Sequence, residues 1–310
     1  MENRFLRGVT WARGGSREAF AWGGEWLDVL VAAAKGWLVD RAPSMGAAIA
    51  YYTVFSLAPV LILIIAIAGL VFGKQAAEGA LFNQIAALVG QESAGAVQAL
   101  LRSASGTASG IVATLIGLGA LILAATGVFG EVQAALNVIW KAPPARSGGA
   151  WDLVKKRLRS LALILGIGFL LVLSLALSAA LEAFSTHLDR LLPGLPFVLD
   201  SLDFLLSFGM TTVLFAMIFK ILPDADVEWQ DVWIGAAVTA LLFAIGRHFI
   251  GLYIGTSGVS SVYHTAGALV LLLVWIYYSA QILLFGAEFA KANGDRRRVK
   301  RDGRSEAAAA

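Results

Sequence analysis

The chain has no cysteine and only three histidines among its 310 residues. The lack of cysteine excludes disulfides, a thiolate nucleophile and cysteine-ligated metal sites. His187, His248 and His264 are widely separated and form neither an H-x-H nor an HExxH pattern, so no clustered metal site is expected. The sequence also contains no P-loop and no G-x-S-x-G elbow, the motifs of nucleotide and serine hydrolases. We therefore expect no cofactor, no metal and no enzymatic activity.

Charge is also scarce, because only 15% of the residues are charged whereas 58% are hydrophobic. Soluble domains average near 25% and 45–50% respectively. The formal net charge of +3 provides no dense basic face for nucleic acid, so a nucleic-acid partner is not expected. Long apolar stretches dominate instead, and about 20 such residues suffice for a helix to cross a membrane. The sequence predicts an all-α, polytopic membrane protein with six transmembrane helices, at about 44–72, 111–140, 161–181, 202–222, 229–254 and 266–289.

The remaining segments divide the chain into three parts. Residues 1–17 are predicted to be a disordered basic N-terminus, residues 18–292 the six-helix membrane domain, and residues 293–310 a disordered basic tail. Within 18–40, tryptophans and charges alternate at helical spacing, which is typical of an amphipathic helix at the headgroup boundary. Between 73 and 110, a second helical pattern broken near Gly90 predicts one or two amphipathic helices on the outer face.

Lysine and arginine set the predicted orientation, because these residues concentrate on the cytoplasmic side of membrane proteins. The N-terminal segment, the 141–159 loop and the tail are rich in both residues, whereas the three opposite loops together hold only Lys74, Arg102 and Arg190. Both termini are therefore predicted to be cytoplasmic, which requires an even number of spans. The expected location is the bacterial inner (plasma) membrane, crossed several times.

The first apolar stretch, 44–72, contains polar side chains and a proline. Pro59 removes one N–H donor and crowds the carbonyl four residues before it. One interpretation is a proline kink in a packed helix. The other is a discontinuous helix that lines a polar cavity, as in transporters. Tyr51, Tyr52 and Ser56 precede the proline, and together with Pro59 they are candidate residues of such a polar path.

Ionisable residues within spans are costly and mark functional candidates. Glu131 is expected about 14 Å from the inner end of its span at 1.5 Å per residue, which is near mid-membrane. By depth, Arg247 is placed to pair with Asp203 or Asp200, and Glu131 is placed to face Lys220 or a neutral partner. Such pairs would fix helices together. Alternatively, some of these residues line a polar path, and this second interpretation adds Gln133, Asn137 and Arg247 to the candidates. Glu288 lies near the end of the last span and is expected to snorkel to the surface.

Four blocks of the sequence together resemble one family. They are AAIAYYTVFSLAP (47–59), GVFGEVQAALNVIWKAP (127–143), ILPDADVEWQDVWIGA (221–236) and VYHTAGALVLLLVWIYYSAQILLFGAEFAKA (262–292). This pattern resembles the YihY/BrkB family of bacterial inner-membrane proteins over about residues 25–292, with one departure at His264, where a glycine is expected. The resemblance implies six transmembrane helices with both ends in the cytoplasm. Members are linked by name to virulence and serum resistance, some are connected with envelope lipid export, and the family long carried the label ribonuclease BN.

These observations lead to three functional hypotheses. The first is a transporter or lipid-translocating protein of the cell envelope, with membrane lipids as partners and the candidate path residues lining its route. The second is a non-transporting scaffold or assembly factor, which predicts a dry bundle with every charge paired. The third and least favoured is a ribonuclease, because the clustered histidines and aspartates that a metal-dependent nuclease needs are missing. The resemblance carries over no catalytic residue. A second copy of the chain and other envelope proteins are further partners to consider.

Overall fold

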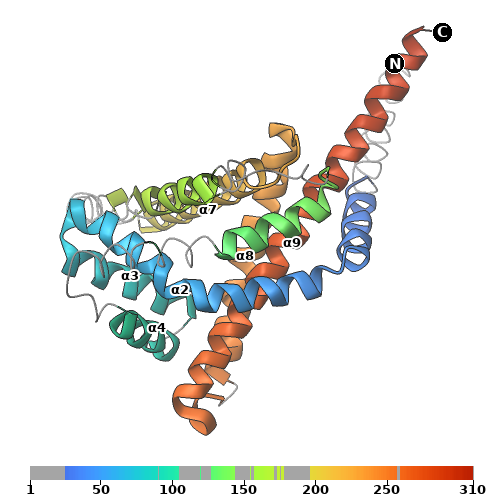
Figure 1. Cartoon of the computed structure of the whole chain (residues 1–310). Helices are drawn as coiled ribbons and strands as arrows, with labels where there is room; N and C mark the ends of the chain where they lie inside the picture. Colours follow the sequence, from blue (N-terminus) through green and yellow to red (C-terminus); the bar gives the residue numbers. More distant parts are fainter. Residues whose placement is uncertain are drawn as a thin grey trace, which may run out of the picture.

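The computed structural model describes residues 25–89, 91–104, 127–143, 157–170, 196–256 and 259–309, with a few isolated helical positions between them. Within these ranges every regular element is an α-helix. Four helices are long and apolar enough to cross a membrane, and their apolar segments are Ala42–Leu70, Phe204–Ile221, Trp229–Gly246 and Val270–Gly303. Parts of the second and third predicted spans lie outside the described residues, which include the short apolar helix Gly127–Ile139 of the second and the helical segment 157–170 at the start of the third. Figure 1 shows how these helices are arranged around the longest one, α9.

Helix α2, Ala42–Phe72, corresponds to the first predicted span. It begins after Arg41, whose φ of 57° is left-handed, and Pro43 occupies the first turn, where a missing N–H costs nothing. It ends at Gly73, whose φ of 82° suits a residue without a Cβ. The Gly73 N–H donates to the carbonyl of Gly69 at 3.0 Å and so closes the last turn.

Pro59 lies inside α2 without interrupting it. The interpretation of a discontinuous helix is therefore wrong. The helix is held on both sides of the proline, because Ile49 belongs to the main core and Leu61 packs with Val97 of α4. A single missing hydrogen bond is tolerated when both halves of a helix are fixed by packing.

Helices α7, Pro196–Ile221, and α8, Trp229–Thr256, follow the fourth and fifth predicted spans. Residues 222–228 join them and are called here the α7–α8 turn. Pro223 cannot donate a helical hydrogen bond, and α7 ends just before it. The Val232 N–H donates to the carbonyl of Glu228 at 3.1 Å, so this residue caps the start of α8.

Helix α9, Val259–Ala309, is far longer than the predicted span 266–289. At 1.5 Å per residue it is about 75 Å long, more than twice the roughly 30 Å of a hydrocarbon core. The expected disordered tail at 293–310 is instead helical through Ala309. Ion pairs of this segment with carboxylates of helix 25–39 and α8 explain the difference, since they give the polar half of α9 something to pack against.

Helices α3, Lys74–Val89, and α4, Gln91–Ala104, confirm the helical pattern expected between 73 and 110. They turn back along α2 and pack into the bundle. Their expected location on the outer side of the membrane stays a prediction. Val97 of α4 and Leu61 of α2 form one buried cluster with Trp275 of α9. The apolar period of these two helices therefore serves the interior of the protein.

Helix 25–39 is the described part of the predicted amphipathic helix at 18–40. Val29 and Ala33 are buried against Phe289 of α9, and the Trp26 ring stacks on Phe289 with centroids 6.1 Å apart. Apolar side chains on its other faces remain exposed, namely Leu27, Leu30, Val31, Leu38 and Val39. This distribution suits a helix that docks on the bundle and also meets lipid.

The main core lies where the helix Gly127–Ile139, α7, α8 and α9 meet. Its most enclosed side chains are Leu136, Ile139, Phe219, Val232 and Leu284. This core supports the α7–α8 turn and the charged groups around it.

Candidate functional site

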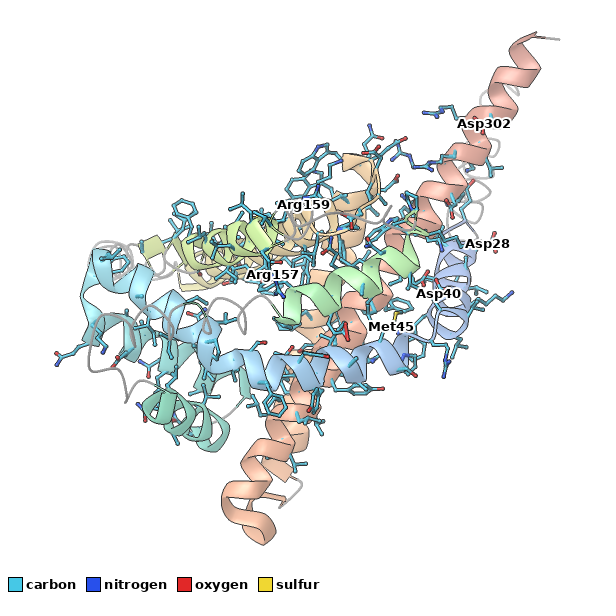
Figure 2. The ribbon with its side chains drawn as sticks, viewed as in Figure 1. Asp28, Asp40, Met45, Arg157, Arg159 and Asp302 are labelled. Carbon is cyan, nitrogen blue, oxygen red and sulfur yellow. The ribbon has the colours of Figure 1, made fainter. Side chains whose placement is uncertain are left out.

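Asp224 fastens the α7–α8 turn to two other segments of the chain. Its Oδ2 accepts hydrogen bonds from Gln133 Nε2 at 3.0 Å and from Asn137 Nδ2 at 3.2 Å, both from the helix Gly127–Ile139. Its Oδ1 accepts from Arg159 Nη1 at 2.7 Å, and its own N–H donates to Asn137 Oδ1 at 2.7 Å. Figure 2 labels Arg159 within this region. We call these four residues the turn network.

Asp231 performs a similar role at the start of α8. The side chain is buried and accepts hydrogen bonds from Asn293 Nδ2 at 3.1 Å and from Arg297 Nη1 at 3.0 Å. Arg297 also donates to the side-chain oxygen of Gln230. A carboxylate in the first turn of a helix is favoured by the helix dipole, and here it also anchors the polar half of α9.

Helix 25–39 is attached to the same half of α9 by charge. Glu25 pairs with Lys300 at 2.6 Å and with Arg296 at 3.4 Å, and the Arg296 guanidinium lies 5.3 Å from the centre of the Trp26 ring. The hydrogen bond from Lys300 lowers the pKa of Glu25 below its ordinary value. Arg296 and Lys300 of α9 therefore hold helix 25–39 against the polar half of α9.

The lowered pKa of Glu25 predicts a pH dependence of this docking. Because the pKa is depressed in the folded state, the pairing is fully present above the ordinary carboxyl pKa of about 4.3 and is lost as pH falls through the folded value. We expect hydrogen exchange in helix 25–39, corrected for the intrinsic rate, to accelerate below about pH 4. Glu25→Gln should remove this dependence. An equal acid response in wild type and variant would show that Glu25 does not hold the helix.

Glu288 lies buried on α9 beside the end of helix 25–39, with only 2% of its surface exposed. The Glu288 carboxyl group lies against Gly36, where a Cβ would come within 2.9 Å of the carboxyl carbon and the glutamate side chain would have to shift. Asp40 and Lys291 lie next to it, with 3.9 Å between Lys291 Nζ and Asp40 Oδ2. Figure 2 places Asp40 beside α9. The expectation that Glu288 snorkels to the surface is wrong.

A cavity of about 530 Å³ opens between these groups. Its walls come from the end of the helix Gly127–Ile139, the α7–α8 turn, the start of α8 and the polar half of α9. Charges of both signs line it, namely Asp224, Asp226, Glu228, Asp231, Asp295, Lys141, Lys291 and Arg298. Several of these are engaged in the pairs above, whereas Asp226, Asp295 and Arg298 are exposed. We call this space the charged cavity. Among the described residues, no three histidine, aspartate or glutamate side chains gather closely enough to hold a metal ion.

The structure separates the residues predicted to line one path. Tyr51 and Tyr52 are 59% and 45% exposed on α2 and contact each other edge to face. Ser56 is buried near the helix Gly127–Ile139, since a Cβ on Gly127 would lie 3.5 Å from Ser56 Oγ. Pro59 is partly buried one turn further along α2. Gln133 and Asn137 share one helix face, and both side chains donate hydrogen bonds to Asp224.

The predicted ion pairs have different outcomes. Lys220 Nζ donates to the carbonyl of Val227 at 2.7 Å and lies 5.5 Å from the centre of the Trp229 ring, so the structure does not bring it to Glu131. The side chains of Asp203 and Arg247 lie outside what the structure describes.

Sequence reasoning missed the residues that organise this end of the bundle. In the sequence, Asp224 and Asp231 appear only within the family-resembling block 221–236, and Arg297 appears only within the predicted basic tail. Two local patterns were visible in the sequence. One is the acidic Pro-Asp-Ala-Asp segment at 223–226, and the other is an amide pair spaced four residues apart on one helix face, Gln133 and Asn137. Their partnership, however, crosses 87 and 91 positions of the sequence.

The fold and the site together define the class of protein. In the part of the chain that the structure describes, all regular elements are helices, four of them have membrane-spanning length, and a charged cluster lies at their ends, which together define a polytopic membrane protein. The chain belongs to the Virulence factor BrkB family, whose model matches residues 33–310. The resemblance to the YihY/BrkB family is thereby confirmed.

Similar proteins carry the name UPF0761 membrane protein. One from Tolumonas auensis is 31% identical over 185 residues, which are 59% of this chain and 58% of the relative. One from Ralstonia nicotianae is 30% identical over 257 residues, 81% of this chain and 55% of the relative. One from Pseudomonas aeruginosa is 26% identical over 261 residues, 82% and 60% respectively. The matches thus span less than two thirds of these relatives. No solved structure matches the chain.

Proposed function

We propose that this protein is a non-enzymatic envelope transporter that moves membrane lipids across the inner membrane. The observation that carries the proposal is the charged cavity, about 530 Å³ in volume, at the ends of apolar helices. Its size lies within the roughly 300–1,000 Å³ of small-molecule sites. The basic groups of the lining match the phosphate of a glycerol headgroup, and the carboxylates can accept hydrogen bonds from its hydroxyls. With both termini cytoplasmic, as the distribution of lysine and arginine predicts, the charged cavity lies on the cytoplasmic side of the membrane.

Arg298 is the group we assign to the headgroup phosphate. It is exposed on α9, lines the charged cavity and also lines a smaller neighbouring cavity of about 310 Å³ with Arg297 and Arg301. Within the described residues it forms no ion pair, in contrast to its two neighbours. Its charge is therefore available to a ligand, and its removal should leave the internal pairs intact.

The test is translocation of a fluorescent headgroup-labelled phosphatidylglycerol in proteoliposomes, followed by dithionite quenching. Wild type should quench well beyond the outer-leaflet fraction. Because a basic residue near an anionic headgroup contributes about 1 kcal/mol, Arg298→Ala should slow translocation about fivefold. Val299→Ala is the matched control, since Val299 is exposed on the same helix and does not line the cavity. Equal rates in Arg298→Ala and Val299→Ala would refute the role of Arg298.

A scaffold or assembly factor remains the second candidate, and a specific observation favours it. Most charges at this end of the bundle are paired internally, among them Glu25, Asp224, Asp231 and Arg297. A scaffold requires no translocation. Wild-type quenching that stops at the outer-leaflet fraction, with and without an imposed proton gradient, would favour it over the lipid transporter.

A further inference from the structure

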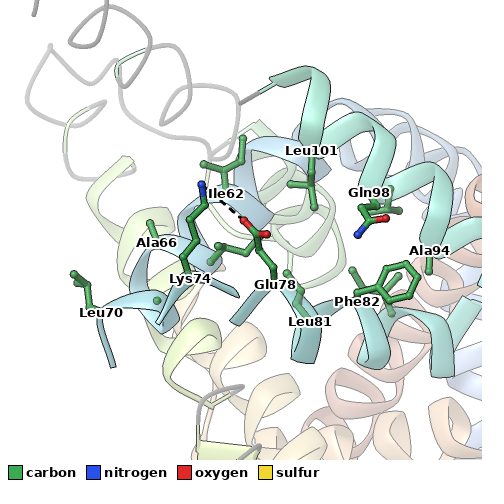
Figure 3. A pocket seen from close by; sticks show the side chains of 14 residues that line it. Ile62, Ala66, Leu70, Lys74, Glu78, Leu81, Phe82, Ala94, Gln98 and Leu101 are labelled. Carbon is green, nitrogen blue, oxygen red and sulfur yellow. Dashed lines mark ion pairs between the residues drawn. The ribbon is translucent and has the colours of Figure 1, made fainter. Parts of the chain in front are cut away.

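A second cavity, apolar and separate from the charged cavity, lies between α2, α3 and α4. Its volume is about 460 Å³. Figure 3 shows side chains of all three helices converging on it. The walls are almost wholly apolar, formed by Ile62, Ile65, Ala66, Gly69, Leu70, Leu81, Phe82, Ile85, Ala94, Val97 and Leu101. The polar groups are Lys74, Glu78 and Gln98.

The length of the cavity matches one leaflet of a membrane. Its wall on α2 extends from Ile62 to Leu70, an axial rise of about 12 Å at 1.5 Å per residue. Half of a hydrocarbon core of roughly 30 Å is about 15 Å. Leu70 at the end of this wall is 88% exposed, and α2 ends at Phe72. The cavity therefore runs inward from the end of an apolar helix over the depth of a single leaflet.

Its mouth is charged. Lys74 and Glu78 begin α3 directly after Gly73, and Lys74 Nζ lies 3.8 Å from the nearer carboxylate oxygen of Glu78. The dashed line in Figure 3 marks this pair. Both side chains are well exposed, so the pair is weak and can open toward a ligand phosphate. An apolar body and a cationic mouth are the two chemical halves of an anionic lipid.

We propose that this cavity holds one acyl chain of an anionic phospholipid, with Lys74 at its phosphate. A peptide segment is a poorer occupant, because Gln98 is the one uncharged polar side chain in the wall and the N–H and C=O groups of a buried peptide need many partners. A hydrocarbon chain needs none and restores the contacts that an empty apolar cavity lacks. The site concerns equilibrium binding and goes beyond the proposed transport, since a bound lipid at α2–α4 does not require translocation through the charged cavity.

The first test fills the cavity. The full-length protein in detergent is delipidated, titrated with phosphatidylglycerol and examined by native mass spectrometry. Ala66→Trp places a large side chain in the cavity from an exposed position on α2, and it should weaken the tightest lipid-binding event at least about tenfold, or 1.4 kcal/mol. Ala47→Trp is the matched control, because Ala47 is exposed on the same helix and lies outside the cavity. Equal lipid affinity in both variants would overturn the proposal.

A second measurement does not depend on a variant that folds. Wild type is photo-crosslinked to phosphatidylglycerol with a diazirine at the end of one acyl chain, and the adducts are mapped. Adducts should concentrate on the cavity walls between Ile62 and Leu101, and adducts confined to other surfaces would overturn the site.

Lys74→Gln should also reduce the preference for phosphatidylglycerol over phosphatidylcholine about fivefold. An unchanged preference would refute the role of Lys74. These experiments measure lipid binding and do not measure translocation. A negative result would therefore reject the acyl-chain site without rejecting the proposed transport, and the converse also holds.

Discussion

Replacing Gly286 with leucine is expected to destabilise the full chain by more than about 3 kcal/mol. Gly286 of α9 faces Thr239 of α8, and a Cβ built on it would lie 2.9 Å from Thr239 Cβ and closer still to Thr239 Oγ1. One turn away, a Cβ on Gly235 would come within 3.2 Å of the Gly286 carbonyl oxygen and of Ala290 Cα. These four small residues, two on each helix, let the backbones of α8 and α9 approach closely.

The energetic cost of this substitution follows from the lack of space. Thr239 is fully buried and cannot turn away without breaking its hydrogen bond to the Gly235 carbonyl at 2.6 Å. Extra methylenes in a filled core typically cost 1–3 kcal/mol, and more where backbone must move. A leucine adds four carbon atoms against a neighbouring helix, so we expect a loss above about 3 kcal/mol, or more than a hundredfold in the ratio of folded to unfolded protein.

The measurement is the monodisperse fraction after extraction, together with the thermal unfolding midpoint. Gly209→Leu provides the matched control, because Gly209 is exposed on α7 and a Cβ there meets nothing within 4 Å. That change should be neutral or slightly stabilising, since glycine is a poor helix former. Similar yields for Gly286→Leu and Gly209→Leu would contradict the close packing of α8 on α9.

The apolar helices could be predicted from the sequence because their signal is local. The end of α2 at Phe72 and the start of α8 at Trp229 coincide with the predicted limits. In both cases a long apolar run meets a glycine, a proline or a charge, and this pattern is visible without knowledge of the rest of the chain.

The polar half of α9 and the small-residue contact with α8 could not be predicted, because each depends on a distant partner. The segment after Phe289 is too polar to be identified as a span, and it becomes an ordered helix through Glu25 and Asp231, which are 275 and 66 positions away in their respective pairs. Gly286 is one of 33 glycines, and nothing local distinguishes it from the others. Only the folded chain shows that Thr239 lies against it.

The candidate site shows the same limit. Gln133 and Asn137 are candidates because they are polar residues in the same predicted span as Glu131. Four residues apart, they share one helix face. What they contact was not visible, since Asp224 comes from a turn that formed no part of the predicted path. A local pattern therefore identified two of the four residues in the turn network and assigned them the wrong neighbours.

Asp224→Ala is expected to destabilise the protein by about 3 kcal/mol, because it removes the one acceptor shared by Gln133, Asn137 and Arg159. A hydrogen bond to a charged group contributes about 1.5–3 kcal/mol, and donors left without an acceptor add to the loss. Arg159 is half exposed and contributes little of this, so most of the effect comes from the two amides. Thermal and denaturant unfolding in detergent measure the change.

Three variants make this prediction specific to the turn network. Asp226→Ala removes an exposed carboxylate from the same turn and should leave the unfolding midpoint unchanged. Asp224→Asn keeps the shape but points an amide N–H₂ at side chains that also donate, so it should recover only part of the loss. In a double-mutant cycle, Asn137→Ala with Asp224→Ala should fall short of the sum of the single effects by about 1–3 kcal/mol, as expected for direct partners. If the two effects simply add, Asn137 does not hold the α7–α8 turn, and the turn at the mouth of the charged cavity owes its position to the packing of α7 and α8 alone.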